Sequence, residues 1–228
     1  MTDFVDYKLK NGVATLRMDD GKANAFGMEM MAALTAGLDR AAALADVVVI
    51  MGRPGLLSGG FDLKVINGPK AGVRAMVDAG AALLLKIYMH PQPVIIACTG
   101  HAVAAGALLL CAGDYRIGVS GDYKIGLNET AIGLSLPTFG LELARDRLDN
   151  RYLNMATLGA ELYPPTMAVT VGYLDQAERP GDFNAALAAK AAQLRALDRE
   201  AYVLAKQRLR GAQEAVIRAS LHDDQPEC

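Results

Sequence analysis

The sequence predicts an α/β protein whose strands and helices alternate, followed by a region of helices alone. Two continuous apolar runs, Val47–Met51 and Val94–Thr99, are typical of strands buried on both faces. Apolar residues recur at helical spacing in Met28–Leu44, and Lys70–Met89 has the pattern of a second long helix. Repeated strand–turn–helix units that give way to helices indicate an α/β core with a helical C-terminal region.

The other elements follow from local signals. Val13–Met18 is predicted to be a strand before the first long helix, and Pro91 and Pro93 end the second one. Ala104–Ala112 is predicted to be a short apolar helix with Gly113 at its C′ position. Later in the chain we expect strands at Tyr115–Val119 and Tyr123–Ile125 and helices at Pro137–Leu148, Asn150–Leu158, Pro165–Val171, Asp182–Ala196 and Arg199–Leu221. We divide the chain into a core, residues 1–181, and a C-terminal helical region, residues 182–228.

Composition and net charge argue against several classes of function. A hydrophobic content of 52% over 228 residues predicts a well-filled core with some apolar surface left for subunit contacts. The formal net charge is −2 and no basic stripe is present, so a nucleic-acid partner is not expected. No apolar run is long enough to span a bilayer, and the first ten residues carry acids and lack a signal-peptide apolar stretch. We therefore expect a cytoplasmic protein with no membrane contact.

Cysteine and histidine give no sign of a metal centre. The three cysteines show no metal-binding spacing, and Cys98 and Cys111 fall in apolar segments, where they are expected to be small core residues. The three histidines form no cluster with cysteines or carboxylates in the sequence. We therefore expect no protein-bound metal.

The segment from Gly100 to Glu129 carries the strongest chemical signal. Small residues open a helix near Ala105, and a lone carboxylate, Glu129, follows on a later loop. Backbone N–H groups at a helix start stabilise a developing oxyanion, and a carboxylate facing them can move a proton to or from carbon. With the upstream loop Ser58–Leu63, this pattern indicates enolate chemistry on a thioester.

Five ordered motifs resemble the crotonase (enoyl-CoA hydratase/isomerase) superfamily over nearly the whole chain. They are Lys22-Ala23-Asn24-Ala25-Phe26, Arg53 to Leu63, Thr99 to Ala107, Gly113-Asp114-Tyr115-Arg116-Ile117 and Gly126-Leu127-Asn128-Glu129-Thr130. The resemblance implies a crotonase-type spiral of ββα units. It also implies that the helical C-terminal region mediates association into a homotrimer or a dimer of trimers. That region is shorter here than the resemblance leads us to expect.

The resemblance also assigns roles to residues of an acyl-CoA site. It implies that Glu129 is the catalytic acid–base and that the amides of Phe61 and Ala105 hold the thioester oxygen. The residues expected to contact CoA or the acyl chain are Lys22, Ala23, Asn24, Gly59, Gly60, Asp62, Leu63, Gly106, Leu108 and Lys206. CoA would arrive as part of the substrate, and no further cofactor is implied.

The choice between reactions depends on one position. Hydratases of the superfamily commonly use two glutamates, and in this sequence the first of those positions is Leu108. The Gly-Leu-Asn-Glu-Thr segment is very similar to that of mitochondrial-type Δ3-Δ2-enoyl-CoA isomerases. This pattern favours an isomerase with a single glutamate in fatty-acid breakdown. Enoyl-CoA hydration and a catalytically weak acyl-CoA-binding homologue remain the alternatives.

Some of these residues also have a purely structural explanation. Asp62 is explained better as a helix N-cap than as a second acid, and His101 as a residue that packs locally. A place on a solvated helix face explains Lys206 equally well. Because the second loop reads Ala104-Ala105-Gly106 where many relatives have more glycine, the site must accommodate a Cβ at Ala105.

Overall fold

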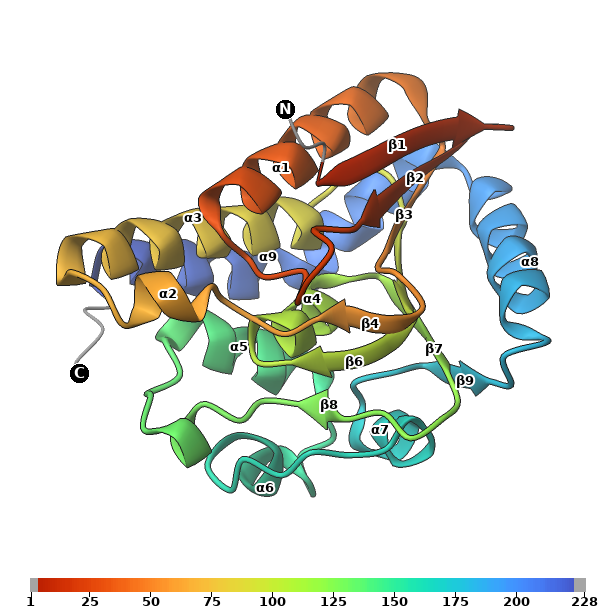
Figure 1. Cartoon of the computed structure of the whole chain (residues 1–228). Coiled ribbons are helices and arrows are strands. Elements are labelled where there is room, and N and C mark those ends of the chain that lie inside the picture. The colour runs from red at the N-terminus through yellow and green to blue at the C-terminus, as the bar shows by residue number, and fades with distance from the viewer. Residues whose placement is uncertain (1–3, 224–228) are drawn as a thin grey trace.

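Two sheets organise the fold of the computed structural model, which describes residues 4–223 (Figure 1). The larger sheet has the strand order β1 (Val5–Lys10), β2 (Val13–Met18), β3 (Val47–Met51), β5 (Val94–Cys98), β7 (Tyr115–Val119) and β9 (Gln176–Glu178). Only the β1–β2 pair in it is antiparallel. The smaller sheet is parallel throughout, with the order β4 (Gly55–Ser58), β6 (Gly100–Val103) and β8 (Ile125–Gly126).

From β3 onward, consecutive strands alternate between the two sheets. The pairs β3–β4, β5–β6 and β7–β8 each add one strand to the larger sheet and one to the smaller, in the same order. The first pair is followed by helices α2 (Leu63–Ile66) and α3 (Lys70–Tyr88), and the second by α4 (Ala105–Ala112). The third is followed by the 3₁₀ turn η1 (Thr130–Ile132) and α5 (Thr138–Arg147). The chain therefore winds as the spiral of ββα units that the resemblance implies.

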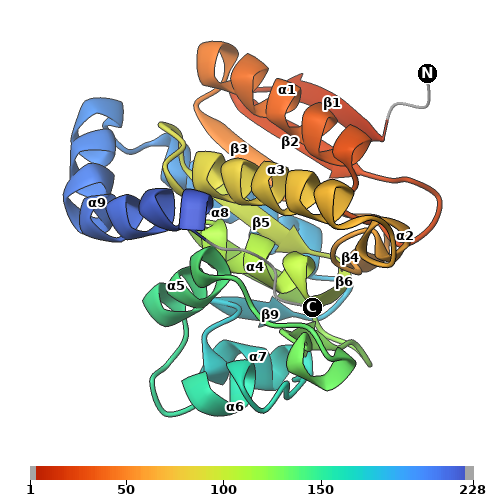
Figure 2. The ribbon, with the colours of Figure 1, turned by 90° about the vertical axis from the view of Figure 1, so that its left-hand side faces the viewer.

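Both faces of the larger sheet are covered, which explains the continuous apolar strands. In β3, Val48 and Ile50 join the core on one side, and Val47 and Val49 join a second cluster on the other. Helix α1 (Met28–Leu44) packs beside α3 on the first side, and α8 (Phe183–Arg195) covers the second (Figures 1 and 2). The prediction of doubly buried strands is confirmed.

The last helices pack on the core. The helices α6 (Leu153–Thr157) and α7 (Pro165–Val171) follow α5, and α9 (Arg199–Asp223) lies against α3 and α5 (Figure 2). Cys98 and Cys111 are buried as predicted. The strands β1, β4, β6 and β9 and the short helix α2 were not predicted. The helix expected at Asn150–Leu158 is shorter, because residues 149–152 form a turn before α6 begins.

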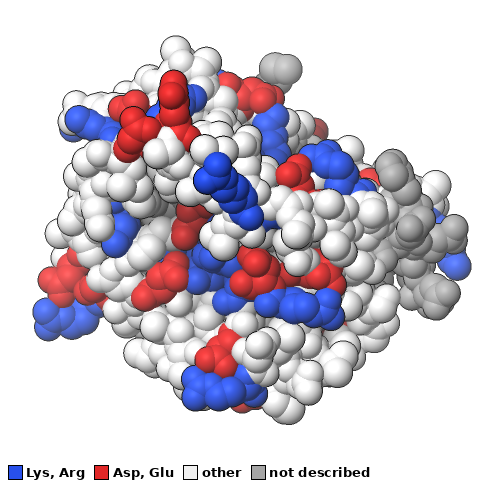
Figure 3. Space-filling view, turned by 180° about the vertical axis from the view of Figure 1, so that it is seen from behind, with Lys and Arg blue, Asp and Glu red and all other residues white. Residues whose placement is uncertain are grey.

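Charges on the surface are mixed. On the face opposite to that of Figure 1, Lys and Arg side chains lie among Asp and Glu side chains (Figure 3). Such mixing gives this face no extended field of one sign. No helix within residues 4–223 is long and apolar enough to cross a membrane.

Candidate active site

Three loops meet at one edge of the smaller sheet. Because β4, β6 and β8 run parallel, their carboxyl ends share an edge, and the chain leaves that edge at Gly59, Ala104 and Leu127. Val103 pairs with Gly126, and the amide of Ala104 donates to the Gly126 carbonyl at 3.0 Å. Glu129 lies three residues further on. The topology thus brings together the loop Ser58–Leu63, the start of α4 and the loop of Glu129, the three segments predicted to form the site.

The first two loops are in direct contact at Gly60. This residue has φ +99°, which glycine adopts without strain. A Cβ placed on Gly60 would lie 2.8 Å from the Cβ of Ala104 and 3.4 Å from the nitrogen of Ala105. Only glycine allows so close an approach between the segment before Phe61 and the start of α4.

The backbone geometry frees the N–H groups of Phe61 and Ala105. Phe26 donates its N–H to the Gly60 carbonyl at 2.8 Å, so the Phe61 N–H of the same trans peptide points away from Phe26. The Ala104 carbonyl accepts the N–H groups of Ala107 and Leu108, so the Ala105 N–H points out of the start of α4. Among the described residues no acceptor takes up either N–H group. Both are available to an oxygen atom of a ligand.

The strained residue of the second loop is Ala104. The expectation placed the difficult Cβ at Ala105, but Ala105 has no positive φ, whereas Ala104 has φ +54° and ψ −124°. The fold thus accommodates the Cβ of Ala105, and the backbone strain falls on the residue before it. Gly106 has a separate steric role, because a Cβ there would lie 2.5 Å from the Ser58 carbonyl oxygen. Gly106 lets α4 begin directly against the end of β4.

Glu129 is a buried carboxyl group. It is 8% exposed, and its Oε2 atom has no hydrogen-bond partner among residues 4–223. Burial raises its pKa from 4.5 to about 7, although the amides of Asn128 and Glu129 itself oppose the rise. No charged side chain in the described chain contributes to this shift. A carboxyl group with this pKa can both accept and return a proton near neutral pH.

A cavity of about 580 Å³ adjoins the first loop. Its walls include six of the residues expected to contact the substrate, namely Lys22, Ala23, Gly59, Phe61, Asp62 and Leu63. Asp62 also caps α2, since its side chain accepts the Lys64 amide at 2.9 Å, as predicted. Met28, Glu29 and Lys64 line the cavity as well, and sequence reasoning missed them. Of these, Lys64 was within reach of prediction, because it follows the first oxyanion loop directly.

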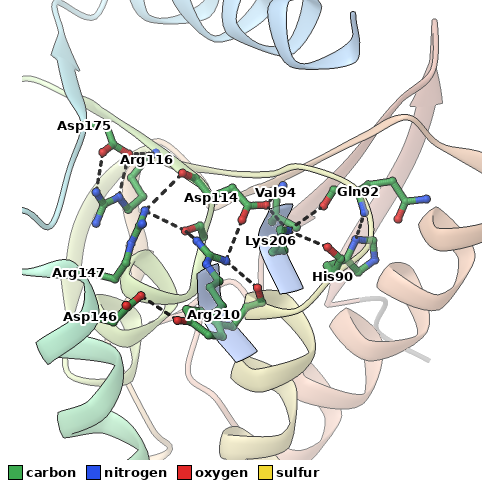
Figure 4. Close-up of polar contacts among 12 residues, drawn as sticks. His90, Gln92, Val94, Asp114, Arg116, Asp146, Arg147, Asp175, Lys206 and Arg210 are labelled. Atoms are coloured by element: carbon green, nitrogen blue, oxygen red, sulfur yellow. Dashed lines mark hydrogen bonds and ion pairs between the residues drawn. The ribbon is translucent and has the colours of Figure 1, made fainter. Parts of the chain in front are cut away.

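Lys206 does not lie at this cavity. It is 7% exposed, and its Nζ atom donates to the His90 carbonyl at 2.7 Å and pairs with Asp114 at 2.7 Å (Figure 4). Burial lowers its pKa, and the nearby Asp114 carboxylate opposes that effect. The expectation of a CoA phosphate contact is wrong, because α9 folds back so that Lys206 binds the core of its own chain.

Two other predicted contacts are enclosed in the protein. Asn24 is fully buried, and its amide nitrogen donates to the Met18 and Leu57 carbonyls. Its side chain therefore positions the loop of Ala23 beside Gly59 and is not available to CoA. Leu108 is 1% exposed in α4, where it packs against Gly140 of α5. His101 packs locally as predicted, with its ring edge against Tyr123.

The site has the elements of acid–base chemistry at a carbonyl compound. Within the described part of the chain no group of three or more His, Cys, Asp or Glu side chains could hold a metal ion. The groups at the sheet edge are two free N–H donors and a carboxyl group of raised pKa. Fold and geometry together fit the class of enzymes that stabilise an oxyanion while a side chain transfers a proton.

The comparisons with known proteins identify the family of this chain. The model of the family described as enoyl-CoA hydratase/isomerase matches residues 8–226, and the chain belongs to this family. It is 29% identical to the human mitochondrial enoyl-CoA delta isomerase 1 over 170 residues, which are 72% of this chain and 56% of that protein. The chain thus spans little more than half the length of this curated relative.

Solved structures match over nearly the full chain. An enoyl-CoA hydratase/isomerase family protein from Pseudomonas syringae is 40% identical with a TM-score of 0.96, covering 98% of this chain and 97% of its own. An enoyl-CoA hydratase from Mycobacterium ulcerans is 34% identical with a TM-score of 0.92, covering 96% of both chains. Both an isomerase and a hydratase are therefore among the relatives.

Proposed function

We propose that this chain is an enoyl-CoA isomerase that moves a double bond from C3 to C2 of an acyl-CoA thioester. The observation that carries the proposal is Glu129, a buried carboxyl group whose pKa of about 7 arises from burial, with no charged side chain among the described residues contributing to it. Glu129 follows β8. This strand pairs with β6, and β6 leads directly to the free N–H of Ala105.

In the proposed reaction one carboxylate moves one proton. Glu129 takes the proton from C2 of a 3-enoyl-CoA, and the electrons of the broken C–H bond spread over the thioester as a dienolate. The N–H groups of Phe61 and Ala105 stabilise the negative oxygen, each by about 3 kcal/mol. Glu129 then gives the proton to C4, which leaves the double bond between C2 and C3. No cofactor besides the CoA of the substrate takes part.

The cavity beside Phe61 is our candidate for the CoA part of the substrate. Lys22 and Lys64 at its wall are exposed cations that can contact phosphate groups. The backbones of Ala23 and Gly59 complete the wall, joined by the hydrogen bond from the Gly59 amide to the Ala23 carbonyl at 2.9 Å. Association through the C-terminal helical region, as a trimer or a dimer of trimers, and a cytoplasmic location stay predictions.

Hydration of a 2-enoyl-CoA is the second candidate. It is favoured by the hydratase among the related structures. Against it stands Leu108, an apolar side chain at the position where the resemblance implies the first glutamate of a hydratase. A hydratase built on this site would have to activate water with Glu129 alone.

A paired turnover assay distinguishes these reactions. The protein is given a 3-enoyl-CoA and, separately, a 2-enoyl-CoA, while ultraviolet absorbance follows the conjugated enoyl thioester. We expect absorbance to rise from the 3-enoyl substrate, with turnover lost in Glu129→Gln and kept in Glu200→Gln, a substitution at an exposed carboxylate of α9. Falling absorbance from the 2-enoyl substrate would replace the isomerase with the hydratase. Tight binding without turnover of either substrate would contradict both enoyl-CoA assignments and leave another crotonase reaction or an acyl-CoA-binding homologue.

A further inference from the structure

We propose that Gly80 of α3 positions the first oxyanion donor by leaving a slot for the ring of Phe61. The inference rests on the proposed function, since it assigns a role in holding the Phe61 N–H. Gly80 lies nearly twenty residues beyond Phe61 in the sequence and touches none of the reacting groups. It acts only through the phenyl ring.

The contact between Gly80 and Phe61 leaves no room for a larger residue. A Cβ on Gly80 would lie 2.5 Å from Cε1 and 2.6 Å from Cζ of the Phe61 ring, and 3.6 Å from the Met31 sulfur. Carbon atoms in contact prefer separations of about 3.5–4.0 Å. With alanine at this position the ring has to move by about 1 Å.

The Phe61 ring and its N–H belong to one tightly held segment. The ring meets Phe26 edge-on with centroids 6.4 Å apart, and Phe26 also pairs with Phe61 through the backbone. On the other side, Gly60 abuts Ala104. The backbone of Phe61 is thus paired with Phe26 while its ring lies against α3, so displacing the ring pulls on the peptide that carries the N–H.

The Phe61 ring also borders open space. Phe61 is half-buried and lines the cavity of about 580 Å³, so a displaced ring could instead turn into the space proposed for CoA. Such a movement would weaken substrate binding and leave the N–H in place. The two consequences predict different kinetics: loss of kcat where the donor moves, and a raised KM where the ring blocks the cavity.

The test compares three glycine-to-alanine variants. For Gly80→Ala we expect kcat on a 3-enoyl-CoA to fall by about 10-fold to 100-fold, as a misplacement of about 1 Å does, with KM changed less than about threefold. Gly37→Ala in α1 is the overpacking control, because its Cβ would lie 2.7 Å from Leu16 Cδ2 and neither residue lines the cavity. Gly72→Ala, at an open position of α3, controls for helix propensity. Both controls should keep the wild-type kcat.

A shorter side chain at residue 61 should remove the clash. Leucine lacks the Cε and Cζ atoms, so Gly80→Ala should cost much less kcat in a Phe61→Leu background than in the wild type. Additive losses in this double-mutant cycle would contradict the inference. A raised KM with unchanged kcat in Gly80→Ala would do the same.

A binding measurement separates this inference from the proposed function. An arylacryloyl-CoA thioester absorbs at longer wavelength when its carbonyl oxygen accepts strong hydrogen bonds, and we expect this shift on the wild type and a smaller one on Gly80→Ala. If the wild type gives the shift but turns over no 3-enoyl-CoA, the isomerase proposal fails while the role of Gly80 stands. An equal shift in both proteins, or none in the wild type, overturns the role of Gly80.

Discussion

At its amino end α4 presents the Ala105 N–H, which has no partner among residues 4–223, whereas at its carboxyl end the Gly113 carbonyl accepts hydrogen bonds from Arg147 and Arg210. The same contrast holds for the nearby carboxyl groups. Glu129, close to the amino end, has an unpartnered oxygen, while Asp114, just beyond the carboxyl end, pairs with Lys206 at 2.7 Å and Arg210 at 2.8 Å (Figure 4). One helix thus separates a polar site left open for a ligand from a polar site closed by the protein.

The difference shows how buried charge serves two purposes. Cations near the carboxyl end of a helix interact favourably with the negative end of the helix dipole, so Arg147 and Arg210 stabilise α4 in its orientation. That orientation aims its positive end at the place where the oxyanion would form. The paired cluster of Asp114, Lys206 and Arg210 holds α4 in place. The Ala105 N–H and the Glu129 carboxyl group remain able to interact with a substrate. Changing carboxylate to amide at each end tests this contrast directly.

Glu129→Gln should have the largest effect on activity. Removing a group that both takes and returns the proton should lower kcat by about 10³-fold or more. At the same time the free energy of unfolding should rise at pH 8, because an unpaired buried carboxylate is replaced by a neutral group. Turnover is followed by absorbance and stability by urea denaturation. A variant that loses stability together with activity would contradict the assignment of Glu129 as an unpaired catalytic group.

Asp114→Asn should change stability in the opposite direction to Glu129→Gln. It leaves the buried Lys206 and Arg210 without their carboxylate, so the free energy of unfolding should fall by about 3–4 kcal/mol. The matched control is Asp39→Asn, which breaks a more exposed ion pair with Lys86 and should cost much less. Urea denaturation measures both. Equal losses in the two variants would mean that the paired cluster does not stabilise the docking of α9.

The pH dependence of the wild type follows from the raised pKa of Glu129. Because the carboxylate is the base, kcat/KM should rise with pH and level off above about 7. Stability should move the other way. Between pH 4.5 and about 7 the folded protein holds a proton that the unfolded chain has lost, so the free energy of unfolding falls as pH rises.

This stability effect amounts to about 3 kcal/mol at most, and it levels off above pH 7. Glu129→Gln should remove it, so the difference in unfolding free energy between variant and wild type should grow from pH 5 to pH 8. Urea denaturation at several pH values provides the comparison. A constant difference would show that Glu129 has an ordinary pKa.

Much of the site could be predicted from local sequence, because its chemistry resides in short loops. The glycines before Phe61, the small residues at the start of α4 and Glu129 all occupy adjoining loops of the structure. Strand β1 was missed although Val5, Tyr7 and Leu9 alternate with charged residues, which is a readable strand signal. Strands β4 and β6 are four residues long, and they form by pairing with each other although they lie far apart in the sequence.

The contacts that could not be predicted depend on tertiary packing. The helical pattern of α9 was visible, but nothing local indicates that Lys206 turns inward to Asp114. Likewise the role of Gly80 requires knowing that α3 passes over the Phe61 ring. Helix α1 was predicted with its observed bounds, Met28–Leu44, because apolar periodicity is a local signal.

The smallest effect is expected at Ala104, where the open end of α4 carries backbone strain. With φ +54° and ψ −124°, this alanine adopts a conformation suited to glycine. Ala104→Gly should therefore raise the free energy of unfolding by about 1 kcal/mol, the relief of strain exceeding the entropy that glycine adds to the unfolded chain. Ala75→Gly, at an exposed position inside α3, should lower it by a similar amount. Opposite signs in urea denaturation would establish the strain, and kcat should stay near the wild-type value because the Ala104 side chain contributes no donor. If both substitutions destabilise equally, the start of α4 carries no strain that glycine can relieve.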